Sequence, residues 1–381
     1  MGNFALWNLG FRPFYLLASV FGVVTILLWV AQLSGLLENA YLQGPLWHGH
    51  EMLFGYTLAV VAGFLLTAVR AWTGEPTPVG VPLMVLAALW VAGRVLVLTP
   101  YGELAAVANA AFPAALALAI AVPLWRARNA RNYFFVGLLL LMAVLVAALH
   151  LTLRDVIVLP PRVSLVLGLD VMLFIMAVIG GRVIPMFTNN GVPGAGATRR
   201  LWIERLALAS ILLLFVADLL RLAAPAVAAL ALAAAIMHGL RLLLWRPWRT
   251  LSTPLVWILH AAYAWIVMYL VLRALAAVGW VADTHAIHAL TVGAIGGMTL
   301  GMMTRTARGH TGRPLRADGF ELSCFVLIQV SALLRVFGAM LPSWYLHSVQ
   351  ISSLLWAGAF GIFVFRYWPI LTRPRLDGKP G

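Results

Sequence analysis

The chain has 381 residues, of which 63% are hydrophobic and only 10% are charged. A water-soluble domain typically carries about 25% charged residues, so this composition excludes a soluble globular protein and indicates an integral membrane protein. The formal net charge is +14, but the arginines lie mostly in short stretches between apolar runs, so we expect no nucleic-acid partner. The single cysteine, Cys324, excludes an intrachain disulfide and an iron–sulfur site built from several thiolates.

Apolar runs of about 20 residues, the length of a helix that crosses the hydrocarbon of a bilayer, occur twelve times. The sequence therefore predicts an all-α polytopic membrane protein, a single transmembrane domain over residues 1–381 with lipid around it. The N-terminus has no basic region or cleavage site, so the first run should be its own targeting signal. The runs cover residues 12–34, 47–69, 79–99, 104–125, 132–153, 163–187, 202–222, 224–245, 254–278, 285–304, 319–341 and 344–367.

The arginines are distributed unevenly over the two sets of connections between these runs. One set is rich in arginine, and the other is poor in arginine and adjoins the start of the second and tenth runs, so the histidines there should lie near the periplasmic side of the membrane. Because connections rich in arginine stay in the cytoplasm, we expect both termini to be cytoplasmic. The rich set, with the termini, holds Arg12, Arg70, Arg126, Arg128, Arg131, Arg199, Arg200, Arg205, Arg246, Arg249, Arg305, Arg308, Arg313, Arg316, Arg366, Arg373 and Arg375.

The second run opens with three polar side chains, His48, His50 and Glu51, in the stretch Trp47-His48-Gly49-His50-Glu51-Met52. On an α-helix, residues two apart point to nearly opposite sides, so the two histidines should face different neighbours. Glu51 follows His48 by three residues and is close enough to accept from its ring and fix its tautomer. A ridge of small residues follows, and helical geometry places it roughly opposite His50: Gly55, Ala59 and Gly63.

A near-copy of this run appears 238 residues later. His288 corresponds to His50, and the small-residue ridge recurs as Gly293, Gly297 and Gly301. A weaker third copy, around Gly181 in the sixth run, suggests three equivalent four-helix units of about 1–128, 129–250 and 251–381. The ridges fit plain helix packing and equally the close approach of a flat macrocycle.

Two imidazoles at equal depth on related helices suit one metal centre held between them. His50 and His288 could be the two axial ligands of a haem iron, and imidazole suits copper as well. Zinc is less favoured, because a structural zinc site needs four ligands and a catalytic site three. His285 lies three residues before His288 and either ligates with it or caps the helix.

Ionisable groups within the spans are costly and are often functional. Arg182, before Pro185 in the sixth run, either pairs with a haem propionate or carboxylate or snorkels toward the cytoplasm. We expect Arg94 and Asp170 to form a structural ion pair with each other.

The remaining histidines are weaker candidates. His260, in the ninth run with aromatic neighbours, is a candidate ligand. For the others inside spans, hydrogen-bonded packing is the better interpretation: His150, His238 and His347. His310 opens a basic turn that either binds an anion or a partner or is simply an arginine-rich loop.

Four stretches together resemble the NnrS family, whose members are bacterial haem- and copper-containing inner-membrane proteins of nitric oxide metabolism and nitrosative-stress defence. The resemblance implies twelve spans, haem b as one or two groups, a place for copper, and nitric oxide as substrate, ligand or effector. It names no electron donor. The stretches are Phe11-Arg12-Pro13-Phe14, Trp47 to Met52, Gly181-Arg182-Val183-Ile184-Pro185, and Met303-Thr304-Arg305 leading to Gly309-His310-Thr311-Gly312-Arg313-Pro314.

The histidines of the second and tenth spans are also similar to those of the haem–copper oxidase and nitric oxide reductase core, whose second and tenth helices hold a low-spin haem. The sixth and seventh runs contain no histidine here, so a binuclear centre of that kind is not expected. His48, perhaps with His260, could instead hold a second haem or a copper. Two other classes stay open: a transporter built from internal repeats without a redox cofactor, and a structural or assembly protein.

Overall fold

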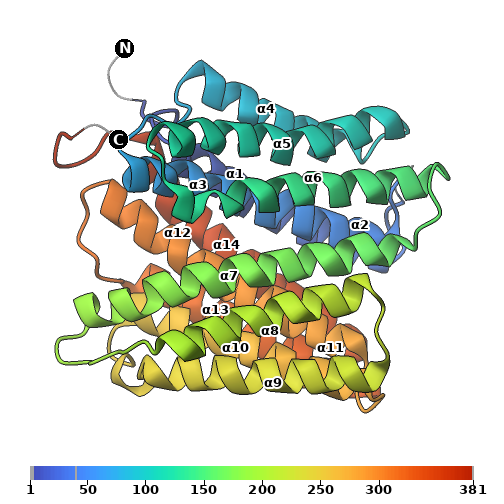
Figure 1. Ribbon diagram of the computed structural model, residues 1–381. Coiled ribbons are helices and arrows are strands. Elements are labelled where there is room, and N and C mark those ends of the chain that lie inside the picture. Colours follow the sequence, from blue (N-terminus) through green and yellow to red (C-terminus); the bar gives the residue numbers. More distant parts are fainter. Residues whose placement is uncertain (1–3, 39–40, 380–381) are drawn as a thin grey trace. The chain divides into compact units, whose positions relative to one another are not determined.

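The computed structural model describes residues 4–38 and 41–379, and within them the regular structure is helical throughout. Twelve long helical segments follow one another in this part of the chain (Figure 1), and ten of them are long and apolar enough to cross a membrane. The chain is therefore a polytopic all-α membrane protein, as predicted. The segments are α1 (Phe11–Leu33), α2 (Gly44–His50) continued by η1 (Glu51–Thr57) and α3 (Leu58–Thr73), α4 (Val81–Leu96), α5 (Gly102–Arg126), α6 (Phe134–Leu153), α7 (Pro161–Gly191), α8 (Leu201–Leu219), α9 (Ala224–Leu244), α10 (Pro254–Ala277), α11 (Asp283–His288) continued by η4 (Ala289–Gly296) and α12 (Gly297–His310), α13 (Gly319–Val336) and α14 (Tyr345–Thr372).

The two segments outside the ten are α4 and α8. The first is a shorter apolar helix of 16 residues. The second carries three charged residues, Glu204, Arg205 and Asp218, in an otherwise apolar sequence. Both lie where the sequence predicted spans.

Two helices continue beyond their predicted ends. α7 runs through Pro185 to Gly191, and the Thr188 hydroxyl donates to the Ile184 carbonyl (2.8 Å) in the turn around the proline. α12 extends to His310, although the apolar run ends at Thr304. The last turns of both helices contain polar residues. Their backbone hydrogen bonds continue beyond the apolar stretch, so the length of the apolar run underestimates the length of the helix.

The described chain divides into two compact units. The first comprises Met1–Gly168, Thr306–Pro314 and Phe363–Gly381, and in it α1 packs along α3 while α5 packs against both α4 and α6. The second comprises Leu169–Arg305 and Leu315–Ile362, and in it α10 packs against α9, α11 and η4. The division into three equivalent four-helix units stays a prediction.

Both members of the predicted repeat change their helical form at the same point. The π-helix η1 begins at Glu51, directly after His50, and the π-helix η4 begins at Ala289, directly after His288. The two starting points are 238 residues apart, the offset at which the sequences match. Because π-helical segments are rare and frequently accompany functional sites, the shared change from α- to π-helix supports the predicted duplication. It also supports His50 and His288 as candidate functional residues.

A buried ion-pair network ties together three helices of the second unit. Arg273 on α10 donates to Asp170 of α7 (Nη1–Oδ1 3.0 Å) and to Asp218 at the end of α8, and it also donates to the Tyr269 hydroxyl (2.7 Å). The predicted pairing of Asp170 with Arg94 is therefore wrong. Each side chain finds a counter-charge within its own unit, and composition alone does not specify which one.

We expect Arg273→Gln to destabilise the second unit strongly. The substitution leaves two carboxylates without a counter-charge, one of them only 1% exposed, and breaking a buried pair in this way costs roughly 3 kcal/mol or more. Thermal unfolding of the purified chain, followed by tryptophan fluorescence, measures the loss. Arg126→Gln, at an exposed position in the last turn of α5, is the matched control, and equal midpoints for the two variants would contradict the structural role.

Candidate functional site

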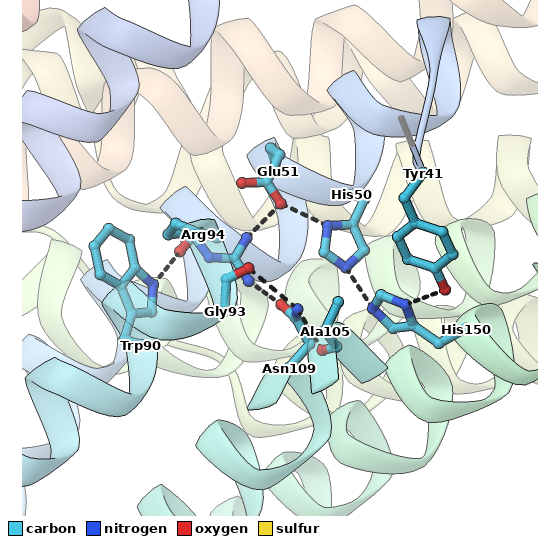
Figure 2. Close-up of polar contacts among 10 residues, drawn as sticks. Tyr41, His50, Glu51, Trp90, Gly93, Arg94, Ala105, Asn109 and His150 are labelled. Atoms are coloured by element: carbon cyan, nitrogen blue, oxygen red, sulfur yellow. Dashed lines mark hydrogen bonds and ion pairs between the residues drawn. The ribbon is translucent and has the colours of Figure 1, made fainter. Parts of the chain in front are cut away.

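A chain of hydrogen-bonded polar side chains lies in the first unit, where α2 passes into η1 (Figure 2). His50 is completely buried, and its Nδ1 lies 2.6 Å from Oε1 of Glu51. Its Nε2 lies 3.2 Å from Nε2 of His150, which comes from α6. Nδ1 of His150 is in turn 2.9 Å from the hydroxyl of Tyr41. Four side chains from the loop before α2, the α2–η1 junction and α6 therefore form one continuous series.

The carboxylate at the inner end of this series has a second partner. Arg94 of α4 donates from Nη1 to Oε1 of Glu51 (2.6 Å) and from Nη2 to the side-chain oxygen of Asn109. Asn109 is held in turn through its amide, which donates to the Ala105 carbonyl (2.8 Å). Glu51 is 1% exposed and Arg94 7%, so this is a buried, hydrogen-bonded charge pair of the kind that stays ionised only while both partners are present.

These partners determine where the hydrogens lie. Paired with a guanidinium, Glu51 is a carboxylate and can only accept, so Nδ1 of His50 carries the hydrogen and Nε2 carries the lone pair. The facing Nε2 of His150 must then be the donor, and its Nδ1 accepts from the Tyr41 hydroxyl. One arrangement of hydrogens therefore satisfies the whole series.

Tyr41 lies in the loop before α2, outside the membrane-spanning helices. Burial raises the pKa of Tyr41, and the positive charge of Arg154 partly opposes that shift. Since a phenol already titrates near pH 10, Tyr41 keeps its hydrogen at neutral pH. This agrees with its role as the donor to His150.

Gly55, five residues after His50, receives the side chain of Arg94. A Cβ on Gly55 would lie 2.6 Å from Nη1 of Arg94 and 2.7 Å from the ring of Phe21. In a π-helix the hydrogen bonds join residues five apart, which brings His50 and Gly55 toward one side. The prediction that His50 lies opposite this residue assumed α-helical periodicity, which does not hold over η1.

The other ridge residues are also covered by side chains of the chain itself. A Cβ on Gly63 would lie 2.8 Å from Tyr15, and one on Gly301 would lie 2.9 Å from Ile258. At Gly293, the counterpart of Gly55, the indole of Trp265 fills the equivalent place. The ridges therefore serve close helix packing.

His48 faces a different neighbour from His50, as predicted. Its ring stacks on Trp29 of α1, with centroids 4.8 Å apart and planes at 20°. The spacing predicted Glu51 as the partner of His48, whereas the structure shows its bond to the adjacent His50. The carboxylate thus orients the more deeply buried of the two rings.

In the second unit, His288 and His285 carry the ring hydrogen on Nδ1, as His50 does. Nδ1 of His288 donates to the carbonyl of Thr284 (2.6 Å), and Nδ1 of His285 donates to the carbonyl of Val336 on α13 (3.0 Å). A carbonyl oxygen only accepts, so the lone pair is on Nε2 in both rings. His285 therefore contacts a neighbouring helix rather than capping its own.

His260 of α10 lies beside α7, with Nε2 2.8 Å from the Thr188 hydroxyl. Its Nδ1 is buried and has no hydrogen-bond partner among the described residues. His238 lies between the Tyr263 hydroxyl (2.7 Å) and the Ala207 carbonyl (3.0 Å), which confirms hydrogen-bonded packing for that ring.

Sequence reasoning missed Arg241, a buried arginine of the second unit with several hydrogen bonds. Arg241 forms two hydrogen bonds with Glu204 (Nε–Oε1 3.0 Å and Nη2–Oε2 2.5 Å), and donates to the Ala177 carbonyl (2.7 Å). A Cβ on Gly181 would collide with its guanidinium. The available signal was an arginine in an otherwise apolar run three residues after His238. Arg182, which was singled out instead, lies half-buried on α7.

His310 is the last residue of α12. Its ring lies 5.6 Å from that of Phe11, and its carbonyl accepts from Arg375 (2.9 Å). It therefore belongs with the basic segments at that end of the first unit and not with the histidines in the last turn of α2.

Within residues 4–38 and 41–379, no three side chains of His, Cys, Asp or Glu converge as a metal site. The NnrS family model, described as NnrS protein, matches residues 5–375. The chain belongs to the NnrS family. This confirms the resemblance, and with it a membrane protein with a function related to nitric oxide. No individually curated protein matches the chain at a significant level.

The NnrS family is generally linked to haem and copper, and the histidines of this chain fit such a ligand. Metal-ligating imidazoles almost always donate their other ring N–H to a carboxylate or a carbonyl. His50 does so to Glu51, His288 to Thr284 and His285 to Val336. Each ring therefore has the tautomer that ligates through Nε2.

We expect Gly55→Ala to disrupt this site. The added methyl group meets both Arg94 and Phe21, so the guanidinium must shift and its bond to the buried carboxylate of Glu51 weakens; complete loss of that bond would cost roughly 3 kcal/mol. Thermal unfolding of the purified chain tests this. Gly137→Ala, in the span α6 with nothing within 4 Å of the new carbon, is the control and should leave the midpoint unchanged or slightly higher. Equal effects at both positions would contradict the proposed contact.

Proposed function

We propose that the chain is a haem protein of nitric oxide metabolism or nitrosative-stress defence, located in a bacterial inner membrane with both termini in the cytoplasm. His50 and His288 are the proposed axial ligands of the iron. The observation that carries the proposal is the repeated helix, in which an imidazole with Nδ1 held by an oxygen directly precedes a π-helical segment in both copies.

The residues around His50 suit an axial ligand. Glu51 holds the ring through Nδ1 and increases its basicity, as carboxylates behind ligating histidines do. Arg94 keeps that carboxylate ionised, and the ring of Phe54, 5.5 Å from that of His50, adds an apolar wall. A haem held by both histidines would supply a redox centre that exchanges electrons, and nitric oxide would reach its iron only by displacing one imidazole.

His150 becomes a further candidate, which the sequence alone did not favour. Its Nε2 faces Nε2 of His50, so ligation of iron by His50 requires the His150 ring to turn aside. As an alternative to iron, copper suits the same facing pair of imidazoles, with the hydrogen of His150 moved from Nε2 to Nδ1. For a second haem or a copper, His48 and His260 remain the proposed ligands, with Arg182 as a proposed partner of a haem propionate.

The absorption spectrum of the purified chain tests the proposal. We expect a Soret band with reducible α and β bands, and we expect His50→Ala and His288→Ala each to abolish one haem signal. His150→Ala should leave the haem signal in place, because its ring turns aside when His50 ligates iron; loss of bound copper in both His50→Ala and His150→Ala, measured by metal analysis with the haem signal unchanged, would instead assign copper to this pair. The control is His347→Ala, since the ring of His347 packs against that of Trp344, with the centroids 5.9 Å apart.

Full wild-type spectra in both ligand variants would overturn the assignment. Complete absence of a chromophore, together with substrate-dependent flux in liposomes, would favour a transporter instead.

A further inference from the structure

A buried arginine without a carboxylate partner lies in the last turn of α13. Arg335 is 8% exposed, and its Nη1 is buried without a hydrogen-bond partner among the described residues. No carboxylate of the described chain forms an ion pair with it. Arg94, Arg241 and Arg273, by contrast, each bind a glutamate or an aspartate. Arg335 therefore differs from the buried arginines that complete an ion pair within the protein.

Two features of the surroundings attract the Arg335 guanidinium, and neither supplies a full negative charge. Its central carbon lies 5.8 Å from the centre of the Tyr345 ring, and the face of an aromatic ring attracts a cation. The C-terminal end of α13 contributes partial negative charge, equivalent to about half a unit. Because buried charges are normally paired and hydrogen-bonded, the environment of Arg335 favours one further anionic group.

A second polar atom without a partner lies at the same junction of helices. Ser348 of α14 is 1% exposed, and its hydroxyl has no hydrogen-bond partner within the part of the chain that the structure describes. A Cβ on Gly338, in the short helix η5 (Gly338–Met340) that follows α13, would lie 2.6 Å from this hydroxyl oxygen. Gly338 follows Arg335 by three residues and Ser348 follows Tyr345 by three. Both contacts therefore form where α13 ends and α14 begins.

This junction lies beside the histidines of α11. Nδ1 of His285 donates to the carbonyl of Val336, the residue after Arg335 (3.0 Å), and the positive charge of Arg335 acts on His285. His288 follows His285 by about one helical turn, directly before η4. The arginine and the proposed iron ligand therefore share one end of the second unit.

We propose that Arg335 and Ser348 bind a planar anion through two of its oxygen atoms, supplied either by a propionate of the haem at His288 or by a free anion such as nitrite. A guanidinium presents parallel N–H groups that match two oxygens in one plane, and a serine hydroxyl donates a further hydrogen bond. The propionate source rests on the proposed haem function, whereas the free anion does not.

The anion reaches these atoms by displacing the Tyr345 ring, because Nη1 of Arg335 and the hydroxyl of Ser348 are both covered. Tyr345 is 42% exposed and is the first residue of α14, directly after the short helix η6 (Pro342–Trp344). Rotamer changes of side chains at binding surfaces are common. The anion then replaces the aromatic ring as the partner of the guanidinium.

The first part of the test measures haem in the purified full chain. Arg335→Gln should hold haem roughly tenfold less tightly, since one lost charge-assisted hydrogen bond accounts for about a factor of ten. It should also make the midpoint reduction potential more negative, because a positive charge nearby favours the reduced iron. Haem dimethyl ester, in which both propionates are esterified, should bind the haem-depleted original chain and Arg335→Gln equally.

The second part measures thermal unfolding in nitrite against chloride at equal ionic strength. The absorption spectrum is recorded at the same time, because it detects nitrite that binds the haem iron instead. A free anion at this site should stabilise the original chain without changing its spectrum, and Arg335→Gln should lose that stabilisation. Ser348→Ala removes only a hydroxyl and should weaken binding of the same anion several-fold, so it serves if Arg335→Gln does not fold.

The matched control is Arg221→Gln, at an exposed arginine of the second unit in the turn after α8, and it should behave like the original chain. Weaker binding of haem but not of its ester identifies the propionate, and stabilisation by nitrite identifies a free anion. If His288→Ala keeps every haem signal while nitrite binding depends on Arg335, the haem assignment is wrong and the anion site stands. Equal behaviour of Arg335→Gln, Ser348→Ala and Arg221→Gln in both measurements would overturn the proposal.

Discussion

The carboxylate of Glu51 is the group on which the first unit's polar interior depends. It is buried at the point where α2 becomes η1, and it accepts from an imidazole and a guanidinium at once. An unpaired charge in such surroundings is very unfavourable, so α4 must deliver Arg94 and the backbone at Gly55 must leave room for it. The orientation of His50, and through it that of His150, follows from this one acceptor.

The second unit uses the same device with different helices. Arg241 grips Glu204 with two hydrogen bonds, and the absence of a side chain at Gly181 lets its guanidinium lie against α7. In both units an arginine binds a glutamate and lies against a glycine of another helix. The residues are Arg94, Glu51 and Gly55 in the first unit and Arg241, Glu204 and Gly181 in the second. A guanidinium pressed against backbone also avoids contact with lipid, which would otherwise be costly.

The sequence was sufficient for the helices, because hydropathy reports apolar length, and the offset of 238 residues that it shows recurs in the starts of the two π-helical segments. It was insufficient for partners. The predicted partner of Arg94 was Asp170, whereas Arg94 binds Glu51. The predicted partner of Glu51 among the histidines was His48, whereas Glu51 binds His50. A pattern of residue types gives no information on which helix lies beside which. The π-helical segments were also invisible, since they shift the helical phase without changing composition.

Arg12 in the first turn of α1 donates to backbone carbonyls at the end of α14, and this contact has a consequence for biosynthesis. The carbonyls of Leu371 and Arg373 are synthesised about 360 residues after Arg12. The N–H of Ala5 likewise donates to the carbonyl of Thr372 (2.7 Å), which is also synthesised late. A ribosome supplies the chain from its beginning, so the first span enters the bilayer long before the groups that complete it exist. Residues 371–373 therefore hold the beginning of α1 in place, and a nascent chain released before them would leave that helix without these hydrogen-bond partners.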